Sequence, residues 1–156
     1  MRVAILGCGH VSDEYFAGCR REPLELVACA DLDFNRAEQK AAEHSVPRAC
    51  SPEELMADPE VELVVNLTPP LAHADASLAA IRAGKHVWSE KPLAATLEQA
   101  REVVAAAAET GVRLGCAPDT FLGGGLQTSI KLIDDGWIGE PVAGAVSRAG
   151  LELPRP

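Results

Sequence analysis

The stretch RVAILGCGHVS at residues 2–12 decides the fold of this chain. Its first half is a short apolar run of strand type, and the run ends in a turn that contains Gly7 and Gly9. Glycine adopts turn conformations that other residues avoid, and it lets a partner approach the backbone closely. The pattern at residues 10–20 then predicts a helix. A strand, a glycine turn and a helix in this order open a parallel α/β sheet.

The chain up to about residue 118 repeats this alternation. Strand and helix patterns alternate throughout, with no repeat, linker or low-complexity segment between them. They predict a doubly wound, mostly parallel α/β sheet of Rossmann type with helices on both faces, in one domain over residues 1–120. Ser51 and Thr96 are the predicted N-caps of two of the helices. Further strands are predicted at residues 24–30, 61–67, 86–88 and 112–116, and helices at 34–44, from 52, at 72–83 and at 97–110.

Residues 121–156 follow a different pattern. Residues 126–135 predict one amphipathic helix, and residues 142–147 alternate loosely, like a half-buried strand of an antiparallel sheet. A lone strand at a terminus has no partner in a parallel domain. We therefore expect a linking helix and the first strand of a truncated C-terminal α/β domain. An open apolar strand edge invites pairing with another chain, which predicts a homo-oligomer formed through residues 122–156.

Composition narrows the classes of partner. Hydrophobic residues make up 47% and charged residues 24%, as in ordinary globular proteins. The formal net charge of -9 repels phosphate backbones and anionic lipids, so we expect no nucleic acid and no membrane partner. No apolar run reaches the ~18 residues needed to span a bilayer. The start does not resemble a signal peptide, and a cytoplasmic location is expected. The five cysteines include no Cys-x-x-Cys pair, which predicts free thiols and no metal site.

The glycine turn carries the pattern of a dinucleotide-binding loop. A diphosphate needs close approach to the backbone and N–H donors, which Gly7 and Gly9 permit and the helix start supplies. Ser12, a small residue, stands where the usual fingerprint has its third glycine or an alanine. Asp31 closes the second predicted strand, where it can accept hydrogen bonds from a ribose hydroxyl and repel a 2′-phosphate. We therefore expect NAD as the cofactor in preference to NADP.

A glycine loop after the first strand also occurs in S-adenosylmethionine methyltransferases. Those enzymes usually place an acid just before the loop. Residues 3–6 of this chain are all apolar at that place, which argues against a methyltransferase.

Two further stretches, NLTPPLAH at residues 66–73 and AGKHVWSEKP at residues 83–92, follow the glycine loop. Together the three motifs resemble the glucose–fructose oxidoreductase / inositol dehydrogenase / rhizopine-catabolism (Gfo/Idh/MocA) family, over about residues 2–148. The resemblance implies an NAD(P)-dependent oxidoreductase. Such an enzyme transfers a hydride to or from a sugar, a cyclitol or a related polyol.

The resemblance also implies roles for particular residues. Glu90 would lie near the nicotinamide ribose, and Lys91 would be the catalytic residue that reaches the substrate hydroxyl. Both follow a strand at its carboxyl end, where open α/β sheets bind their ligands. The other expected cofactor-binding residues lie in the glycine loop or at strand ends: Gly7, Gly9, His10, Val11, Asp31, Leu67, Thr68, Pro69, Pro70 and His73.

Two departures from the family concern the substrate. After its sixth strand the family commonly has an aromatic residue, an asparagine and an arginine, whereas this chain has CAPDTF at residues 116–121. The Asp-x-x-x-His pair of the family's second domain does not occur in this sequence. A Rossmann half by itself offers only one wall to a sugar, so we expect little or no turnover. The alternative function is a stand-alone, non-enzymatic dinucleotide-binding or interaction module.

Overall fold

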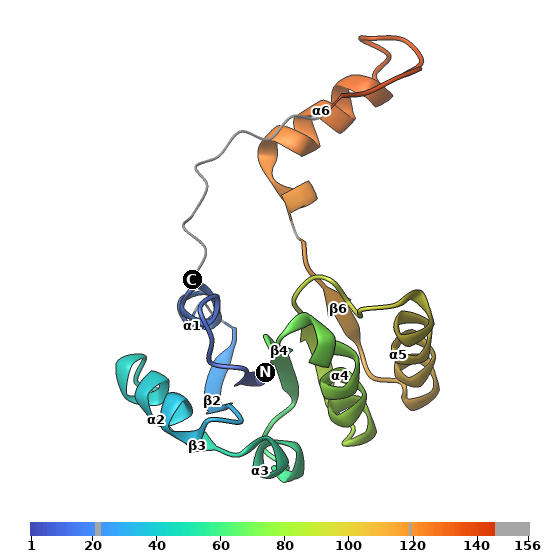
Figure 1. Ribbon diagram of the computed structural model, residues 1–156. Helices are drawn as coiled ribbons and strands as arrows, with labels where there is room; N and C mark the ends of the chain where they lie inside the picture. Colours follow the sequence, from blue (N-terminus) through green and yellow to red (C-terminus); the bar gives the residue numbers. More distant parts are fainter. Residues whose placement is uncertain (21–22, 119, 146–156) are drawn as a thin grey trace. The chain divides into compact units, whose positions relative to one another are not determined.

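The computed structural model describes residues 1–20, 23–118 and 120–145, and the chain divides into two units, Met1–Pro118 and Asp119–Pro156 (Figure 1). The strands of the first unit are β1 (Arg2–Leu6), β2 (Glu25–Ala30), β3 (Ala49–Cys50), β4 (Leu63–Asn66), β5 (His86–Ser89) and β6 (Leu114–Cys116). Its α-helices are α1 (Ser12–Cys19), α2 (Phe34–Glu43), α3 (Pro52–Ala57), α4 (His73–Arg82) and α5 (Leu97–Thr110).

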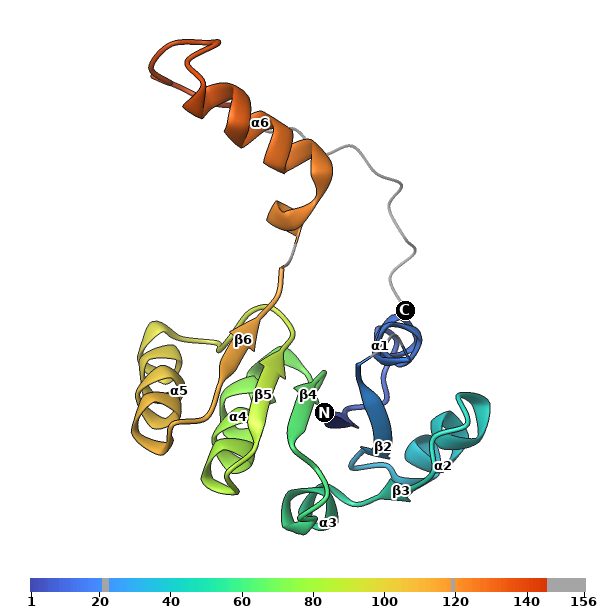
Figure 2. The same ribbon diagram turned by 180° about the vertical axis from the view of Figure 1, so that it is seen from behind.

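The six strands form one parallel sheet in the order β3-β2-β1-β4-β5-β6, and β4, β5 and β6 lie side by side in Figure 2. This is the doubly wound order of a Rossmann fold, and it confirms the predicted fold class. The winding reverses between β1 and β4, which is where such sheets bind ligands. The sequence pattern did not locate β3, because its two residues are too few to show a period.

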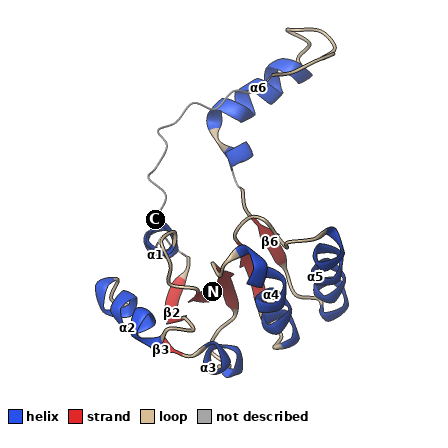
Figure 3. Ribbon diagram, viewed as in Figure 1, coloured by secondary structure: helices blue, strands red, loops and turns tan. Residues whose placement is uncertain are grey.

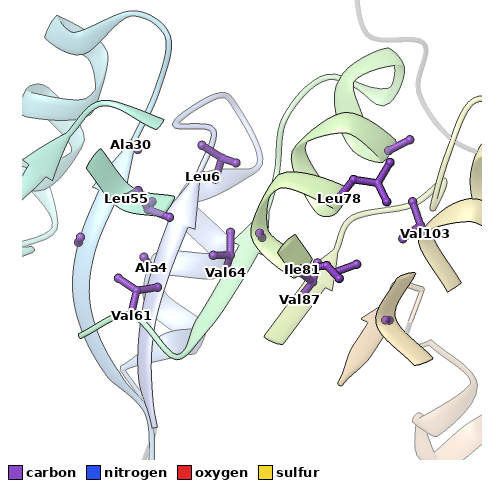
Figure 4. Close-up of a cluster of buried hydrophobic side chains, with 14 of the residues drawn as sticks. Ala4, Leu6, Ala30, Leu55, Val61, Val64, Leu78, Ile81, Val87 and Val103 are labelled. Carbon is purple, nitrogen blue, oxygen red and sulfur yellow. The ribbon is translucent and has the colours of Figure 1, made fainter. Parts of the chain in front are cut away.

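Helices cover both faces of the sheet, whose strands are red in Figure 3. Successive strand residues point to opposite faces. On one face Ala4 and Leu6 of β1 belong to the same buried cluster as Leu55 of α3, Leu78 of α4 and Val103 of α5 (Figure 4). On the other face the buried residues are Val3, Ile5, Phe16 of α1 and Ala37 of α2, with neighbours from β2 and β4.

The helix signals in the sequence mostly correspond to real helix ends. Ser51 forms a capping box with Glu54 at the start of α3, and Thr96 forms one with Gln99 at the start of α5. Helix α1 begins at Ser12, later than the expected residue 10, because the glycine turn extends through the residues before it. Helix α4 likewise begins at residue 73, after a 3-10 turn at Pro70–Ala72.

The second unit contains a 3-10 turn (Thr120–Leu122) and the helix α6 (Gly124–Asp134). The expected helix is therefore present, and it starts two positions before residue 126. The strand expected at residues 142–147 is not formed at residues 142–145, and residues 146–147 lie outside the described part of the chain. Strand geometry needs a pairing partner, and residues 120–145 contain no other strand.

Two further findings concern the described residues as a whole. None of the helices described there is long enough and apolar enough to cross a membrane. All five cysteines of the chain are free thiols, and four of them are buried: Cys8, Cys19, Cys29 and Cys50.

Lys85 is a buried lysine at the start of β5, and its side chain ties the loop before β4 to the sheet. It is only 4% exposed, and its Nζ donates hydrogen bonds to the carbonyl oxygens of Asp58 (2.5 Å) and Val61 (3.0 Å). Burial lowers the pKa of Lys85 below the ordinary value of a lysine, and the charge of Asp58 offsets part of that effect.

The difference in the free energy of unfolding between the native chain and Lys85→Met is expected to grow with pH in the alkaline range. The pKa of Lys85 is lower in the folded state than in the unfolded state, so unfolding takes up a proton at pH values between these two pKa values. In that pH range the free energy of unfolding of the native chain rises with pH. The contribution of Lys85 is therefore lost as the pH falls through the folded-state pKa. Urea unfolding of both proteins from about pH 8 to about pH 10.5 measures it. A difference that stays flat or shrinks as pH rises would contradict it.

Candidate functional site

The carboxyl edge of the sheet brings the expected site segments into one row. Four residues directly follow the last residue of a strand: Gly7, Leu67, Glu90 and Ala117. Each donates its backbone N–H to the carbonyl of the last residue of the neighbouring strand, over 2.8–3.0 Å. The ladder of the sheet thus continues into the loops, and these loops are fixed relative to one another.

The two glycines of the turn have different surroundings. Gly7 has a φ of +99°, and a Cβ on it would lie 2.7 Å from the backbone carbonyl of Leu67 and 2.9 Å from the amide of Thr68. A Cβ on Gly9 would meet no atom within 4 Å. Gly7 is therefore required by the protein itself, whereas the space in front of Gly9 is open to a ligand. Ser12 closes the turn, since its Oγ donates to the Gly9 carbonyl over 2.6 Å.

Asp31 lies at the mouth of the glycine turn. Its side chain is 9% exposed, and its Oδ2 accepts the backbone N–H of Cys8 in the turn over 2.8 Å. Its Oδ1 accepts the backbone N–H of Asp33 over 2.9 Å. The carboxylate thus holds the loop and keeps lone pairs that can accept further hydrogen bonds from a ligand.

Arg36 is a residue of this site that the sequence analysis missed. Its Nη1 lies 3.3 Å from Oδ1 of Asp31, and its Nη2 lies 3.6 Å from Oδ2 of Asp33. The guanidinium is half-exposed, so it can leave these partners for another anion. The available signal was a basic residue in the first turn of the helix that follows Asp31.

A cavity of about 550 Å³ opens beside Asp31, on the face of the sheet that α3 and α4 cover. The helix side chains that line it were not predicted, because which side of a helix faces a cavity is set by packing. It is lined by strand-end residues and by α3, among them Gly7, Asp31, Thr68, Pro69, Pro52 and Met56.

Asn66, the last residue of β4, is completely buried and fully hydrogen-bonded. Its Nδ2 donates to the His73 carbonyl (2.9 Å) and to Oγ of Ser77 (3.0 Å). Its Oδ1 accepts from the backbone N–H (3.2 Å) and the hydroxyl (2.7 Å) of Thr68. One amide side chain thus fixes the loop that begins at Thr68 against α4. Asn66 stands in the NLTPPLAH motif, but its role could not be predicted from the motif.

Asn66→Ala is expected to lower the free energy of unfolding by about 2–4 kcal/mol, because it leaves several buried polar groups without partners. Urea unfolding followed by circular dichroism measures the loss. Asn35→Ala, at an exposed position of α2, is the control and should stay within about 0.5 kcal/mol of the native chain. Equal effects of the two substitutions would show that the Asn66 hydrogen bonds contribute little.

His73 is the first residue of α4, and its ring is buried, at 1% exposed. Nδ1 lies 2.5 Å from the carbonyl oxygen of Pro92, and Nε2 lies 2.7 Å from the carbonyl oxygen of Thr68. The ring therefore connects the loop after β4 to the loop after β5.

Glu90 and Lys91 follow β5 at the carboxyl edge. Oε1 of Glu90 accepts the hydroxyl of Tyr15 over 2.9 Å, and Oε2 accepts the backbone N–H of Lys91 over 2.6 Å. Tyr15 belongs to α1, so this pair joins the helix after the glycine turn to the loop after β5. Lys91 is exposed to solvent. Tyr15 was not among the predicted site residues.

The other expected site residues differ in their exposure to solvent. Thr68 is partly buried, while His10, Val11, Pro69 and Pro70 are exposed. Leu67 is 7% exposed, and its side chain packs in the core on the α1 face. Only its backbone belongs to the edge of the sheet.

Asp13, Glu43 and His44 form a cluster with metal-ligand chemistry on the outer side of α1 and α2, with ligand atoms within 4.8 Å of one another. Nζ of Lys40 lies 2.5 Å from Asp13 Oδ1 and 2.9 Å from Glu43 Oε2. Hydrogen bonds from Lys40 and then His44 lower the pKa of Asp13. The lysine thus already neutralises these carboxylates, and the cluster carries no metal assignment.

The sheet order, the glycine turn and the acid at the end of β2 define a Rossmann domain of the NAD-binding class. A family model described as "Oxidoreductase family, NAD-binding Rossmann fold" (GFO_IDH_MocA) matches residues 1–117. The chain belongs to this Gfo/Idh/MocA family, which confirms the resemblance of the three motifs.

Curated relatives include sugar and cyclitol enzymes. The 1,5-anhydro-D-fructose reductase of Ensifer adhaerens is 38% identical over 150 residues, which are 95% of this chain and 45% of the relative. The scyllo-inositol 2-dehydrogenase (NADP(+)) of Bacillus subtilis is 33% identical over 137 residues, 87% of this chain and 38% of the relative. The chain thus spans less than half the length of these relatives.

Solved structures show the same arrangement. An NAD binding oxidoreductase from Klebsiella pneumoniae matches with a TM-score of 0.83 and 33% identity, over 91% of this chain and 40% of that chain. A 3-ketoreductase from Actinomadura kijaniata, in complex with TDP-benzene and NADP, matches with a TM-score of 0.81 and 30% identity (90% and 45%). A dehydrogenase from Bordetella pertussis, in complex with NADH and UDP-GlcNAcA, matches with a TM-score of 0.82 and 28% identity (87% and 40%).

Proposed function

We propose that this chain is the cofactor-binding part of an NAD(P)-dependent oxidoreductase that acts on a sugar, a cyclitol or a related polyol. The observation that carries the proposal is the glycine turn. Gly7 has no room for a side chain, whereas the space in front of Gly9 is open and Asp31 lies at its mouth. The substrate class rests on the names of relatives such as the anhydrofructose reductase and the inositol dehydrogenase.

The residues of the turn and the cavity fit a dinucleotide. The open space at Gly9 and the start of α1 suit the diphosphate, since backbone N–H groups and the helix dipole favour negative charge there. Asp31 faces the cavity beside the turn, where a carboxylate can accept the hydroxyls of the adenosine ribose. Thr68 and Pro69 also line this cavity.

Asp31 and Arg36 together set the preference between NAD and NADP. The carboxylate of Asp31 favours NAD, because it accepts ribose hydroxyls and repels a 2′-phosphate. Arg36, ion-paired to Asp31 and half-exposed, offsets part of that repulsion. We infer a preference for NAD with measurable affinity for NADP, and the solved relatives include complexes with NADH and with NADP.

Lys91 is the proposed catalytic residue. A bound nicotinamide supplies the chemistry of hydride transfer. Lys91, exposed at the carboxyl edge of the sheet, would exchange a proton with the substrate hydroxyl through its Nζ. The Glu90 carboxylate accepts both the Lys91 backbone N–H and the Tyr15 hydroxyl, and this fixes the loop that carries the lysine.

Fluorescence titration with NADH and NADPH tests the proposal on the native chain. We expect saturable binding of both, tighter for NADH, and no competition by S-adenosylmethionine. The matched variant Gly9→Val should stay folded and lose affinity, because its side chain occupies the open space. If neither dinucleotide binds, or if the methyl donor competes, the proposed cofactor class is wrong.

The isolated chain is expected to differ from a full enzyme in its catalytic turnover. We expect residues 1–156 to bind the cofactor with little turnover of any polyol, because one wall cannot exclude water from the substrate. Activity of a chain extended by the downstream coding sequence would favour the enzyme over a non-enzymatic module.

Self-association through residues 122–156 stays a prediction, and the apolar spacing of Leu126, Ile130 and Ile133 along α6 supports it.

A further inference from the structure

His73 has an unusual pair of hydrogen-bond partners. Both of its ring nitrogens face backbone carbonyl oxygens at hydrogen-bonding distance, Nδ1 facing Pro92 and Nε2 facing Thr68. The ring is almost fully buried, and no buried side-chain nitrogen or oxygen in the described residues lacks a partner. Solvent therefore does not replace either partner.

The count of protons decides what this geometry means. A carbonyl oxygen only accepts hydrogen bonds, so each of the two contacts requires an N–H on the ring. A neutral imidazole carries one N–H, and its other nitrogen holds a lone pair that repels a carbonyl oxygen. Two N–H donors exist only in the imidazolium form. Neither partner is a carboxylate, so dipoles of the backbone stabilise the charge.

We propose that His73 is a positioning residue that acts as a buried imidazolium and joins the Thr68 loop to the Glu90-Lys91-Pro92 loop. This inference deepens the proposed function, and it rests on that function for its effect on cofactor binding. The ring has no nitrogen left for a cofactor atom, so His73 acts through the two loops it joins.

The two loops depend on His73 to different degrees. Thr68 keeps two hydrogen bonds to Asn66 when the ring is removed. The carbonyl of Pro92 loses its bond to the ring, and Pro92 directly follows the proposed catalytic Lys91. We therefore expect loss of the ring to displace the Lys91 loop and to leave the Thr68 loop in place.

Nitrogen-15 NMR of the labelled, cofactor-free chain at about pH 7.5 tests the proton count, since a freely titrating imidazole is mostly neutral there. Both ring nitrogens of His73 should show the shift of protonated nitrogen. His86 is the internal control, because its Nδ1 accepts the backbone N–H of Arg113 over 3.0 Å and must be unprotonated. His73→Gln assigns the signals by removing them. A lone-pair nitrogen on His73 would overturn the proposal, whether or not the chain binds NADH.

Affinities for NADH and ADP in His73→Gln test the positioning role. NADH affinity should fall about tenfold or more, because the Pro92 carbonyl of the Lys91 loop loses its donor. ADP, which lacks the nicotinamide half, should change less than about threefold. His86→Gln should leave both affinities near those of the native chain. An equal loss of NADH and ADP affinity, or no loss of either, would contradict the role.

Discussion

Gly7→Ala is expected to lower the free energy of unfolding of the Rossmann unit by about 3–5 kcal/mol. A residue other than glycine at a φ of +99° is strained, at a cost of about 1–3 kcal/mol. The new Cβ would also lie 2.7 Å from the Leu67 carbonyl, which is rigid backbone, and such overpacking costs about 1–3 kcal/mol more. Because domains are stable by only about 5–15 kcal/mol, much of the protein should unfold well below the native transition, as urea and thermal unfolding will measure.

Gly9→Ala provides the matched control in the same turn. Its Cβ would meet no atom of the protein, and its φ lies outside the positive range, so the free energy of unfolding should stay within about 1 kcal/mol. Its affinity for NADH should nevertheless fall. Similar stabilities of the two variants would mean that the turn relaxes around a side chain at Gly7.

Asp31→Asn is expected to shift the ratio of NADPH to NADH affinity toward NADPH by about tenfold or more. The amide oxygen can still accept the Cys8 N–H that Asp31 holds at 2.8 Å, so the glycine turn should keep its shape, while the Asp33 N–H loses its acceptor. The substitution removes the charge that repels a 2′-phosphate and weakens the hydrogen bonds to the ribose, which are worth about 1.5–3 kcal/mol when the acceptor is charged. Parallel fluorescence titrations with NADH and NADPH measure the ratio.

Arg36→Ala should shift the same ratio in the opposite direction. It removes the guanidinium 3.3 Å from Asp31, which offsets the carboxylate and can turn to a phosphate. NADPH affinity should fall while NADH affinity changes little. If both variants leave the ratio unchanged, the two residues do not read the 2′ position of the ribose.

The fold was predictable where the signal is local. The apolar run into Gly7, the capping box at Ser51 and the acid at Asp31 each depend on neighbours in the chain. Strand β3 was not predictable, since two residues carry no period and its pairing with Cys29 and Ala30 is set by tertiary structure. Residues 142–145 of the expected strand show the converse: alternation alone does not make a strand there, and residues 120–145 hold no other strand.

The candidate site was predictable as a set of segments, and less so as a set of contacts. The resemblance named His73, but its environment comes from the carbonyl of Pro92, which lies 19 positions away. Asn66 looks like the end of an ordinary strand, and only the packing of α4 reveals its hydrogen bonds to His73 and Ser77. Tyr15 was missed for the same reason, because it meets Glu90 across the edge of the sheet. Arg36 differs, since its partners Asp31 and Asp33 are close in the sequence and the signal for it was local.

The shortness of the outermost strands affects how this unit behaves in concentrated solution. The sheet ends at β3, with two residues, and at β6, with three. Each border therefore exposes very few unbonded amide and carbonyl groups, and a longer border would be the template for cross-β aggregation. The Rossmann unit is thus built to resist fibril growth by strand addition at either end of its sheet.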